Sequence, residues 1–571
     1  MTPPDRAIEL CYLDMPKTEL FPDTLHLPDL AALAENCLIN GLDHEDGDLP
    51  YCLFDIMSAP PRKAHTCFDW SDHTGRIIDA LCLIRTLTGS TVSDRVLPSL
   101  IRLLDKGFGA DGLHYTPENQ WTAEQANMHY QRSVINALLS RHLTTGSEEA
   151  LGRLRALLAG LAKISVKRKD YWYFPAVEYF RSGWFRGDWD ILGYGIDPAN
   201  TNGRLIYGIS CAHELLNDQV SAELAGNYAR HAMHYSSAFL EDGSFATGME
   251  FREGHFHSRA VTLLGVIRYG VTFGDSSAVS WGKKVFDRAA KYGTTFGWFP
   301  ERIVEERAHG CETCATVDMM EAAIWLARAG YHEYWETAER FLRNQLVESQ
   351  LKDVGSLVRA RRRINPNDPT PQSELQGFVG GFSGWSQPND LLSKVMHDWD
   401  FYMCCCCQGV RGLFNAYTNA VSSSNRGTEV NLLINHASPA ALVRSYLPTQ
   451  GRVEVTVRRA GRVAIRIPAW VERGKLKAWA GQVEVPARCV GHQLVFDSVQ
   501  PGDAVSMTFP VARSSSTERV LGVDYTSSWL GDSIVKMDPA GSLIPLYDRE
   551  AAFHGPIHLV KKTACEVPFS L

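Results

Sequence analysis

The spacing of apolar residues is helical from about residue 27 to residue 421. Stretches such as 74–85, 133–142, 204–216 and 319–328 place apolar residues three and four positions apart, and many end near Gly, Asn or Asp. Aromatic and glycine-rich connections separate these stretches. Helix pairs repeated in this way predict a helical toroid, in which inner helices converge on a pocket and loops line its mouth.

The pattern changes near residue 425, where short runs of alternating apolar and polar residues begin. Turn residues surround each of these runs, which span 453–459, 462–468, 493–497 and 504–510. The alternation predicts an antiparallel β-sandwich packed against the helical part. No catalytic constellation lies in these runs. We therefore expect a helical catalytic domain over residues 1–425 and a β-sandwich over 426–571, which is structural or positions carbohydrate.

Composition narrows the class of protein. With 571 residues, 45% apolar and 21% charged, the chain can bury at least one large core, and disorder is excluded. The net charge of -8 is spread along the chain without a basic tract, which argues against nucleic acid and anionic membranes as partners. No signal-like apolar stretch follows Met1. Fourteen cysteines, many inside helical patterns (Cys37, Cys82, Cys211), favour a reducing compartment, so we expect a cytoplasmic protein.

Two sulfur-rich motifs suggest the chemistry. Four consecutive cysteines occupy positions 404–407, and upstream lies Glu312-Thr-Cys314. Adjacent cysteines are poorly placed to pair with each other, but both can bind one soft cation, because thiolate is a ligand that Zn²⁺ prefers. The Glu-x-Cys pair adds a carboxylate and a further thiolate. Together the motifs predict a tetrahedral zinc site.

The ordered motifs also resemble a known family. Glu312-x-Cys314 and, about ninety residues later, Cys404-Cys405-x-x-Gln408-x-x-Arg411 are similar to the Glu-x-Cys and Cys-Cys-x-x-Asn-x-x-Arg patterns of glycoside hydrolase family 127, the β-L-arabinofuranosidase family. Members join an (α/α)6 barrel to β-sandwich modules. The resemblance therefore implies a mainly α protein with an (α/α)6 barrel, or helical toroid, followed by a C-terminal β-sandwich.

The resemblance also assigns roles to residues. It implies these zinc ligands: Glu312, Cys314, Cys404 and Cys405. It makes Cys404 the nucleophile and Arg411 a substrate-binding residue. Counting back from Arg411 places the working pair at 404 and 405, but a register that uses Cys406 and Cys407 stays open.

The implied chemistry is that of a retaining glycosidase. Zinc holds sulfur as thiolate, the thiolate attacks an anomeric carbon, and water hydrolyses the thioglycosyl intermediate. A general acid/base must protonate the leaving oxygen and later deprotonate water. Glu301, in an aromatic and proline-rich turn that could raise its pKa by desolvation, is our choice, with Glu305 and Glu306 as alternatives or simply a solvated face beside Arg307.

The sequence offers further candidates for pocket residues. The segment around His255 and His257 resembles the family's Gly-His motif that opens an inner helix, so one of the two is expected to contact sugar hydroxyls; capping of that helix is an equally weighted alternative for each. Two further segments interleave acids with tryptophan, a composition found in sugar sites and equally in surface loops. They supply these additional candidates: Asp69, Asp72, His73, Asp188 and Asp190.

The chain departs from the family pattern at three positions. Ser133 and Asn202 stand where members tend to carry pocket histidines, and Gln408 replaces the asparagine. The machinery can thus be shared while the sugar differs. L-arabinofuranose is the family's default, which this chain does not itself show.

Three functions remain open from the sequence. The first is a zinc-thiolate exo-glycosidase. The second is a hydrolase or lyase of uronic sugars that uses carboxylates or histidines and a structural zinc, since closed four-ligand zinc sites are usually structural. The third is a non-catalytic carbohydrate-binding protein. We expect a small carbohydrate or glycoside as partner, and a homodimer is one assembly that the sequence allows.

Overall fold

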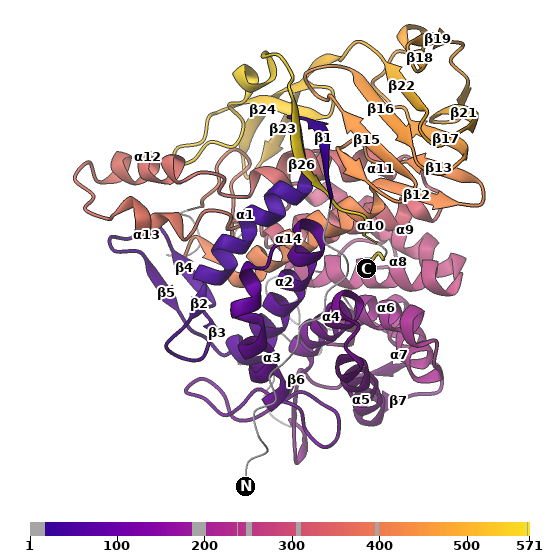
Figure 1. The fold of residues 1–571 in the computed structure, drawn as a ribbon. Coiled ribbons are helices and arrows are strands. Elements are labelled where there is room, and N and C mark those ends of the chain that lie inside the picture. The colour runs from indigo at the N-terminus through magenta and orange to yellow at the C-terminus, as the bar shows by residue number, and fades with distance from the viewer. Residues whose placement is uncertain are drawn as a thin grey trace.

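The computed structural model describes residues 17–185, 201–236, 238–246, 254–303, 310–393, 399–567 and 569–571. Its first part is helical and its last part is made of strands (Figure 1). Within these ranges, no helix is long and apolar enough to cross a membrane.

Six helices of the first part are buried on nearly all sides. They are α2 (Thr74–Thr88), α4 (Met128–Thr145), α6 (Ile206–Leu216), α8 (Phe256–Phe273), α10 (Thr313–Arg328) and α14 (Met403–Ala420). Each helix in this series packs against the next one, and α14 packs against α2. A helix that is buried all round belongs in the interior of a domain. These six helices therefore form the inner layer of the helical part.

A second set of helices covers this inner layer and exposes polar faces. It consists of α1 (Leu27–Asn40), α3 (Leu97–Lys106), α5 (Glu148–Ile164), α7 (Gln219–Arg230), α9 (Ser276–Ala289) and α11 (Tyr334–Phe341). In the same order, these helices contact α2, α2, α4, α6, α8 and α10. Side chains that cap their first turns, such as Ser147 on α5 and Asp275 on α9, satisfy main-chain N–H groups there. Two further helices follow, α12 (Val354–Ile364) and α13 (Gln372–Gln376).

Short strands lie in the connections between helices of the first part. They are β2 (Leu42–Asp43) with β3 (Leu49–Pro50), β7 (Val166–Lys167) with β8 (Trp172–Tyr173), β6 (Ala126–Asn127) with β9 (Glu178–Phe180) and β10 (Gly183–Trp184), and β4 (Leu53–Asp55) with β5 (Arg62–Ala64) and β11 (Phe401–Tyr402). The last group matters for the site, because β11 leads directly into α14. Phe401 and Tyr402 pair with Phe54 and Leu53 of β4, so the start of α14 is fixed to an early segment of the chain.

Two sheets dominate the part after α14. One contains β12 (Val421–Ser424), β13 (Gly427–Val430), β17 (Gly461–Arg466), β21 (Gln493–Val499) and β20 (Cys489–Val490). The other contains β14 (His436–Ala437), β15 (Ala441–Ser445), β16 (Arg452–Val457), β22 (Ala504–Thr508), β18 (Lys477–Ala480) and β19 (Val483–Val485). Inward side chains of both sheets, such as Val463 and Ile465 from one and Val455 and Met507 from the other, share one apolar cluster.

The remaining strands return to the helices. A three-stranded sheet of β23 (Arg513–Val520), β24 (Val523–Leu530) and β25 (Ser533–Asp538) contributes Trp529 and Ile534 to the core of the helical part. The strand β26 (Leu559–Ala564) pairs antiparallel with β1 (Lys17–Pro22), and Figure 1 shows the indigo β1 beside the yellow β26. The change from helices to strands occurs at residues 420–421, while the division into two domains at 425 stays a prediction.

A buried ion network joins the two parts. Glu339 of α11 accepts hydrogen bonds from Arg343 Nε at 2.6 Å, from the main-chain N–H of Leu433 at 2.9 Å and from Arg466 of β17. Burial would raise the pKa of Glu339, but the two guanidinium groups and the Leu433 N–H together lower it. The carboxylate thus stays ionised inside the protein and links α11 to the first sheet.

Candidate active site and thiol cluster

A cavity of about 370 Å³ opens where the inner helices begin. It is lined by Leu53, Phe68, Asp72, Arg76, His129, Arg204, His255, His257, Glu301, Glu312, Trp385, Trp399, Tyr402 and Cys404. Aromatic rings lie beside charged groups in this lining, and Trp385 stacks on Tyr402 with ring centroids 5.7 Å apart. A concave site with a few converging polar groups is the usual form of a small-molecule site.

Most charged, histidine and thiol side chains of the lining come from the N-terminal ends of the inner helices, whereas Glu301 comes from a turn. Those at helix ends stand within about three residues of a helix start: Asp72 and Arg76 at α2, His129 at α4, Arg204 at α6, His255 and His257 at α8, Glu312 at α10, and Cys404 at α14. Helix N-termini present unpaired N–H groups and a partial positive charge. The cavity is therefore suited to hold thiolates, carboxylates and the oxygen atoms of a polar ligand.

Three thiols meet at this end of the inner layer. Cys314 Sγ lies 3.9 Å from Cys404 Sγ and 3.7 Å from Cys405 Sγ, and the last two are 3.9 Å apart. Zinc–sulfur bonds of about 2.3 Å in a tetrahedron separate sulfur atoms by about 3.8 Å. The thiols already have this spacing, and Cys404 alone of the three reaches the cavity lining. The donor set fits a zinc ion.

Helix geometry explains why only two of the four consecutive cysteines take part. Successive residues of a helix point about 100° apart, so a run of four cannot face one site. Cys406 and Cys407 pack in the apolar core, and Cys406 Sγ lies 3.5 Å from the Phe382 carbonyl. The structure thus brings Cys404 and Cys405, and not Cys406 and Cys407, to Cys314.

Charge favours the thiolate at Cys404. Burial acts to raise the pKa of Cys404, but hydrogen bonds from Cys314 and Cys405 and the positive charge of Arg76 lower it to about 6. Burial raises the pKa of Cys314 and Cys405 well above the usual value. The positive charge of Arg76 thus favours a thiolate at the sulfur atom that faces the cavity.

Glu312 and Glu301 both line the same cavity. Glu312 precedes α10, and its Oε2 lies 2.8 Å from His255 Nε2; it is not part of the close three-atom cluster. Glu301 is 7% exposed. Its main-chain N–H donates to the Gly310 carbonyl at 3.1 Å, and its carbonyl accepts from the Phe256 N–H at 2.8 Å. The Glu301 turn is therefore fixed to the start of α8.

His257 belongs to a buried hydrogen-bonded chain behind the cavity. Its Nδ1 lies 2.6 Å from Asp318 Oδ2, and Gln408 Nε2 donates to Asp318 Oδ1 at 3.3 Å. Burial lowers the pKa of His257 and raises that of Asp318. Gln408, at the family's asparagine position, thus reaches the cavity only through Asp318 and His257.

Arg411 lies deeper than the sequence suggested. It is 2% exposed, donates to Asp79 Oδ2 at 2.7 Å, and is absent from the cavity lining. Its guanidinium stands over the Tyr207 ring at 5.7 Å. A substrate contact by Arg411 stays a prediction, and its observed contacts join α14 to α2.

The two positions where the family tends to carry histidines also lie outside the lining. Ser133 of α4 is buried and donates to Asp72, and a Cβ on Gly75 would come within 2.8 Å of the Ser133 main chain, so α2 and α4 approach closely here. Asn202 is buried beside His231. The cavity histidine of α4 is instead His129, one helical turn before Ser133.

Sequence reasoning missed several lining residues. They are Leu53, Phe68, Arg76, His129, Arg204, Trp385, Trp399 and Tyr402. Phe68 stands next to the Asp-Trp-Ser-Asp-His segment already suspected, while His129 and Arg204 are visible only as polar residues at helix starts. Asp72 lines the cavity, and Asp69 and His73 lie buried behind it. Asp188, Asp190, Glu305 and Glu306 fall outside the described residues.

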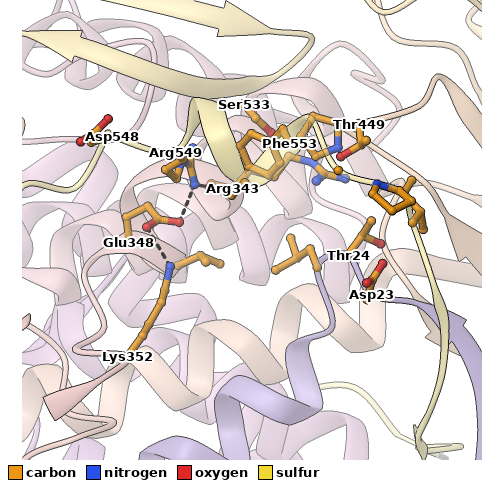
Figure 2. A pocket seen from close by; sticks show the side chains of 17 residues that line it. Asp23, Thr24, Arg343, Glu348, Lys352, Thr449, Ser533, Asp548, Arg549 and Phe553 are labelled. Atoms are coloured by element: carbon orange, nitrogen blue, oxygen red, sulfur yellow. Dashed lines mark hydrogen bonds and ion pairs between the residues drawn. The ribbon is translucent and has the colours of Figure 1, made fainter. Parts of the chain in front are cut away.

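A second cavity, of about 440 Å³, lies between the helical part and the C-terminal segments and contains none of the expected site residues. Figure 2 shows Glu348 between Arg549 and Lys352, with ion pairs of 2.5 and 2.7 Å. Its strong charges largely neutralise one another, which distinguishes it from the thiol-containing cavity.

Comparison with known proteins gives a likeness in structure. No protein-family model and no curated protein matches the sequence. Among solved structures, the GH127 β-L-arabinofuranosidase Ara127N-Se from Geobacillus stearothermophilus T6 has 14% identity and a TM-score of 0.57 over 88% of this chain and 80% of its own. The GH127 β-arabinofuranosidase BT3674 has 13% identity and a TM-score of 0.59 over 89% and 81%. A protein described as a glycoside hydrolase has 12% identity and a TM-score of 0.59 over 90% and 81%. The chain thus has the fold of these glycoside hydrolases.

Proposed function

We propose that the protein is a retaining exo-glycoside hydrolase in which Cys404 is the nucleophile and Glu301 the general acid/base. The supporting observation is that one cavity presents both groups, a thiol from a buried three-thiol cluster and a carboxyl from a fixed turn. Aromatic rings in the same lining suit the apolar faces of a sugar ring.

In this proposal the reaction proceeds in two displacements. Cys404 Sγ attacks the anomeric carbon while Glu301 gives its proton to the leaving oxygen, so that a sulfur–carbon bond replaces the glycosidic bond. Glu301 then removes a proton from water as the water attacks the same carbon and releases Cys404. Two inversions at one carbon give net retention. The N-terminal ends of the inner helices stabilise negative charge during both steps.

We propose that Cys314, Cys404, Cys405 and Glu312 hold a zinc ion. The sulfur spacings of 3.7 to 3.9 Å support the three thiols, and Glu312 lines the same cavity as Cys404. Zinc supplies one chemical effect when bound, which is to keep its cysteine ligands deprotonated at neutral pH. His255, bonded to Glu312, would orient that carboxylate, as outer partners of metal ligands commonly do.

We also propose that the helical part is a closed (α/α)6 barrel and that the two larger sheets form a β-sandwich. The cyclic packing of α2, α4, α6, α8, α10 and α14 supports the barrel. The shared apolar cluster of the two sheets supports the sandwich. A catalytic domain over residues 1–425 and a second domain over 426–571 follow from this division, with β1 crossing from the first domain to pair with β26.

We propose two candidate substrate classes. The resemblance favours a β-L-arabinofuranoside. A second candidate, a uronic sugar, is favoured by two guanidinium groups in the lining, Arg76 and Arg204. Arg76 pairs with Asp72 at 2.9 Å. Arg204 is buried, and burial with repulsion from Arg132 and Arg76 lowers its pKa to about 10, a sign of excess positive charge that a substrate carboxylate would relieve.

The decisive experiment replaces single thiols. Cys404→Ser should abolish hydrolysis of aryl glycosides while the protein still folds, as a cooperative thermal unfolding transition would show. Cys406→Ser, the matched control on the same helix, should retain activity because that thiol packs away from the cavity. Undiminished turnover by folded Cys404→Ser protein would disprove the nucleophile.

A panel of nitrophenyl furanosides, pyranosides and uronides identifies the sugar. Preferential cleavage of the β-L-arabinofuranoside supports the first substrate, and cleavage of uronides alone supports the second. If none is cleaved but sugars bind, a non-catalytic carbohydrate-binding protein replaces the proposal.

A further inference from the structure

A second group of metal-binding side chains lies behind the cavity. The side-chain donor atoms of Cys52, Asp69 and His73 all stand within 4.8 Å of one another, and all three residues are buried. None of them belongs to the three-thiol cluster, and the proposed hydrolysis uses none of them. The arrangement therefore requires an explanation of its own.

The local backbone brings Asp69 and His73 together. Residues Asp69–His73 form a single π-helical turn before α2, in which the N–H of His73 donates to the Phe68 carbonyl at 3.0 Å. The wider turn places residues four apart on the same side, so both side chains point the same way. Single π-turns are rare and occur frequently at functional sites.

Cys52 reaches the same point from another segment. It lies between β3 and β4, where its N–H donates to the Ala64 carbonyl at 2.9 Å and its carbonyl accepts from the Met403 N–H at 2.9 Å. The main chain on both sides of the thiol is thus fixed. The thiol belongs to the same short segment that pairs with β11, immediately before Cys404.

The ring nitrogens of His73 lack short hydrogen bonds. The side chain is fully buried, neither nitrogen meets normal hydrogen-bond geometry with a described residue, and the carboxylates of Asp69 and Asp72 lie 3.5 and 3.9 Å away. Its Nδ1 is 3.5 Å from Asp69 Oδ1, too long for a good hydrogen bond but close to the separation of two ligands on one zinc ion. A buried imidazole without well-formed hydrogen bonds is costly unless something binds it.

Outer hydrogen bonds hold the Asp69 carboxylate. Its Oδ2 accepts the main-chain N–H of Thr66 at 2.9 Å and lies 2.8 Å from His65 Nδ1, while Oδ1 lies 3.5 Å from His73 Nδ1 and 3.4 Å from the Thr66 hydroxyl. Carboxylates that bind metals are usually held by such outer hydrogen bonds.

The charges around His73 also favour a cation. The Cys52 thiol and the carboxylates of Asp69 and Asp72 all lie close to the buried imidazole of His73. A thiolate, a carboxylate and a neutral imidazole together have a charge of -2, which one divalent cation neutralises. Cysteine, histidine and aspartate are all zinc ligands.

We propose that Cys52, Asp69 and His73 form a second zinc site, with the fourth position taken by a solvent molecule or the Thr66 hydroxyl. Binding displaces one proton from the Cys52 thiol to solvent and involves no redox change. The His73 ring packs edge-on against Tyr402 with centroids 5.6 Å apart. The bound ion would thereby support β4, β11 and the start of α14 behind the cavity. This proposal does not depend on the reaction that the cavity performs.

The test is the zinc content of the purified full-length protein. Apo-protein titrated with Zn²⁺ should bind two ions per chain. Cys52→Ser and His73→Ala should each bind one, Cys314→Ser should also lose one ion, and Cys82→Ser, a buried-cysteine control on α2, should bind two. A wild type that binds a single ion, with Cys52→Ser unchanged, overturns the second site and leaves the three-thiol site intact.

Anomalous diffraction from the wild-type protein tests the second site without any variant, so the result does not depend on whether the variants fold. Crystals of the wild type should give two anomalous peaks at the zinc absorption edge, one between Cys314, Cys404 and Cys405 and one between Cys52, Asp69 and His73. A single peak at the three thiols in zinc-saturated crystals would show that the second group is only a hydrogen-bonded cluster. A single peak at Cys52 would instead support this inference while removing the zinc of the proposed hydrolase.

Discussion

Glu339 provides the sharpest test of how the helical and β parts are joined. Its carboxylate is 1% exposed and accepts hydrogen bonds from Arg343, Arg466 and the main chain of Leu433. The substitution Glu339→Gln keeps the shape of the side chain but removes its charge. One carbonyl oxygen remains, and the NH₂ group takes the place of either Oε1, which accepts from Arg343, or Oε2, which accepts from Arg466 and the Leu433 N–H.

The magnitude follows from the donors that are left behind. In either orientation of the amide at least one guanidinium loses its acceptor, and an unsatisfied buried donor costs about 1–3 kcal/mol, more when charged. Removing one partner from a buried ion pair has cost about 3–5 kcal/mol. Because the two estimates overlap, we expect Glu339→Gln to lower the free energy of unfolding by about 3–5 kcal/mol.

The assay is unfolding by urea and by heat at neutral pH, with Glu333→Gln as the control. Glu333 precedes the same helix but is exposed, so its substitution should change stability by no more than about 0.5 kcal/mol. A loss below about 1 kcal/mol at Glu339, or equal losses at both positions, would refute the structural role of the network.

The pH dependence gives a second check. The pKa of Glu339 is below its usual value of about 4.3, so the folded state binds this proton less tightly than the unfolded state. Its contribution to stability is therefore complete above that pH and is lost as pH falls. The difference between the wild type and Glu339→Gln should shrink on acidification, and a difference that grows would contradict the argument.

Three further predictions concern the helical part of the protein and its proposed zinc site. Gln408→Leu should lower kcat/KM by less than about tenfold, which corresponds to the loss of one neutral hydrogen bond. His257→Ala should lower kcat/KM by more, because His257 lines the cavity and Gln408 does not. The reverse order would refute the hydrogen-bonded chain through Asp318. Glu321 is buried on α10, and burial raises its pKa to about 7, so its contribution to stability is present below about pH 4.3 and is lost as pH rises through 7. Glu321→Gln should remove this loss of stability in unfolding measured from pH 5 to 8. An unchanged profile would place the titration at another residue. Dialysis against a chelator should remove zinc and activity together, and Zn²⁺ but not Mg²⁺ should restore both, because thiolates select the softer ion.

The fold was accessible from sequence where local pattern decides structure. Alternating residues at 453–459 and 504–510 became β16 and β22, and the helical spacing of 319–328 lies within α10. The pairing of β1 with β26 could not be predicted from the sequence, because it depends on segments at opposite ends of the chain. The return of β23, β24 and β25 to the helical core is hidden for the same reason.

Some residues of the site could likewise be predicted from the sequence and others could not. Cys314, Cys404 and Cys405 could be found because thiols in fixed spacing are unusual in any other role, and the structure brings them together. His129 could not, since one polar residue at the start of a helix carries no distinctive spacing. The depth of Arg411 was also invisible, because motif position gives no measure of burial, and its partner Asp79 lies on a distant helix.

The pairing of β1 with β26 affects how the protein is made. His26, just after β1, contacts the Thr563 carbonyl across a separation of 537 residues. A ribosome that adds about 5–20 residues per second needs roughly half a minute to two minutes to cover that distance. Throughout this time the first strand has left the ribosome without its partner, and its edge can pair with other chains. Yield in a cell should therefore depend on chaperones that bind nascent N-terminal segments, and slower translation should increase aggregation.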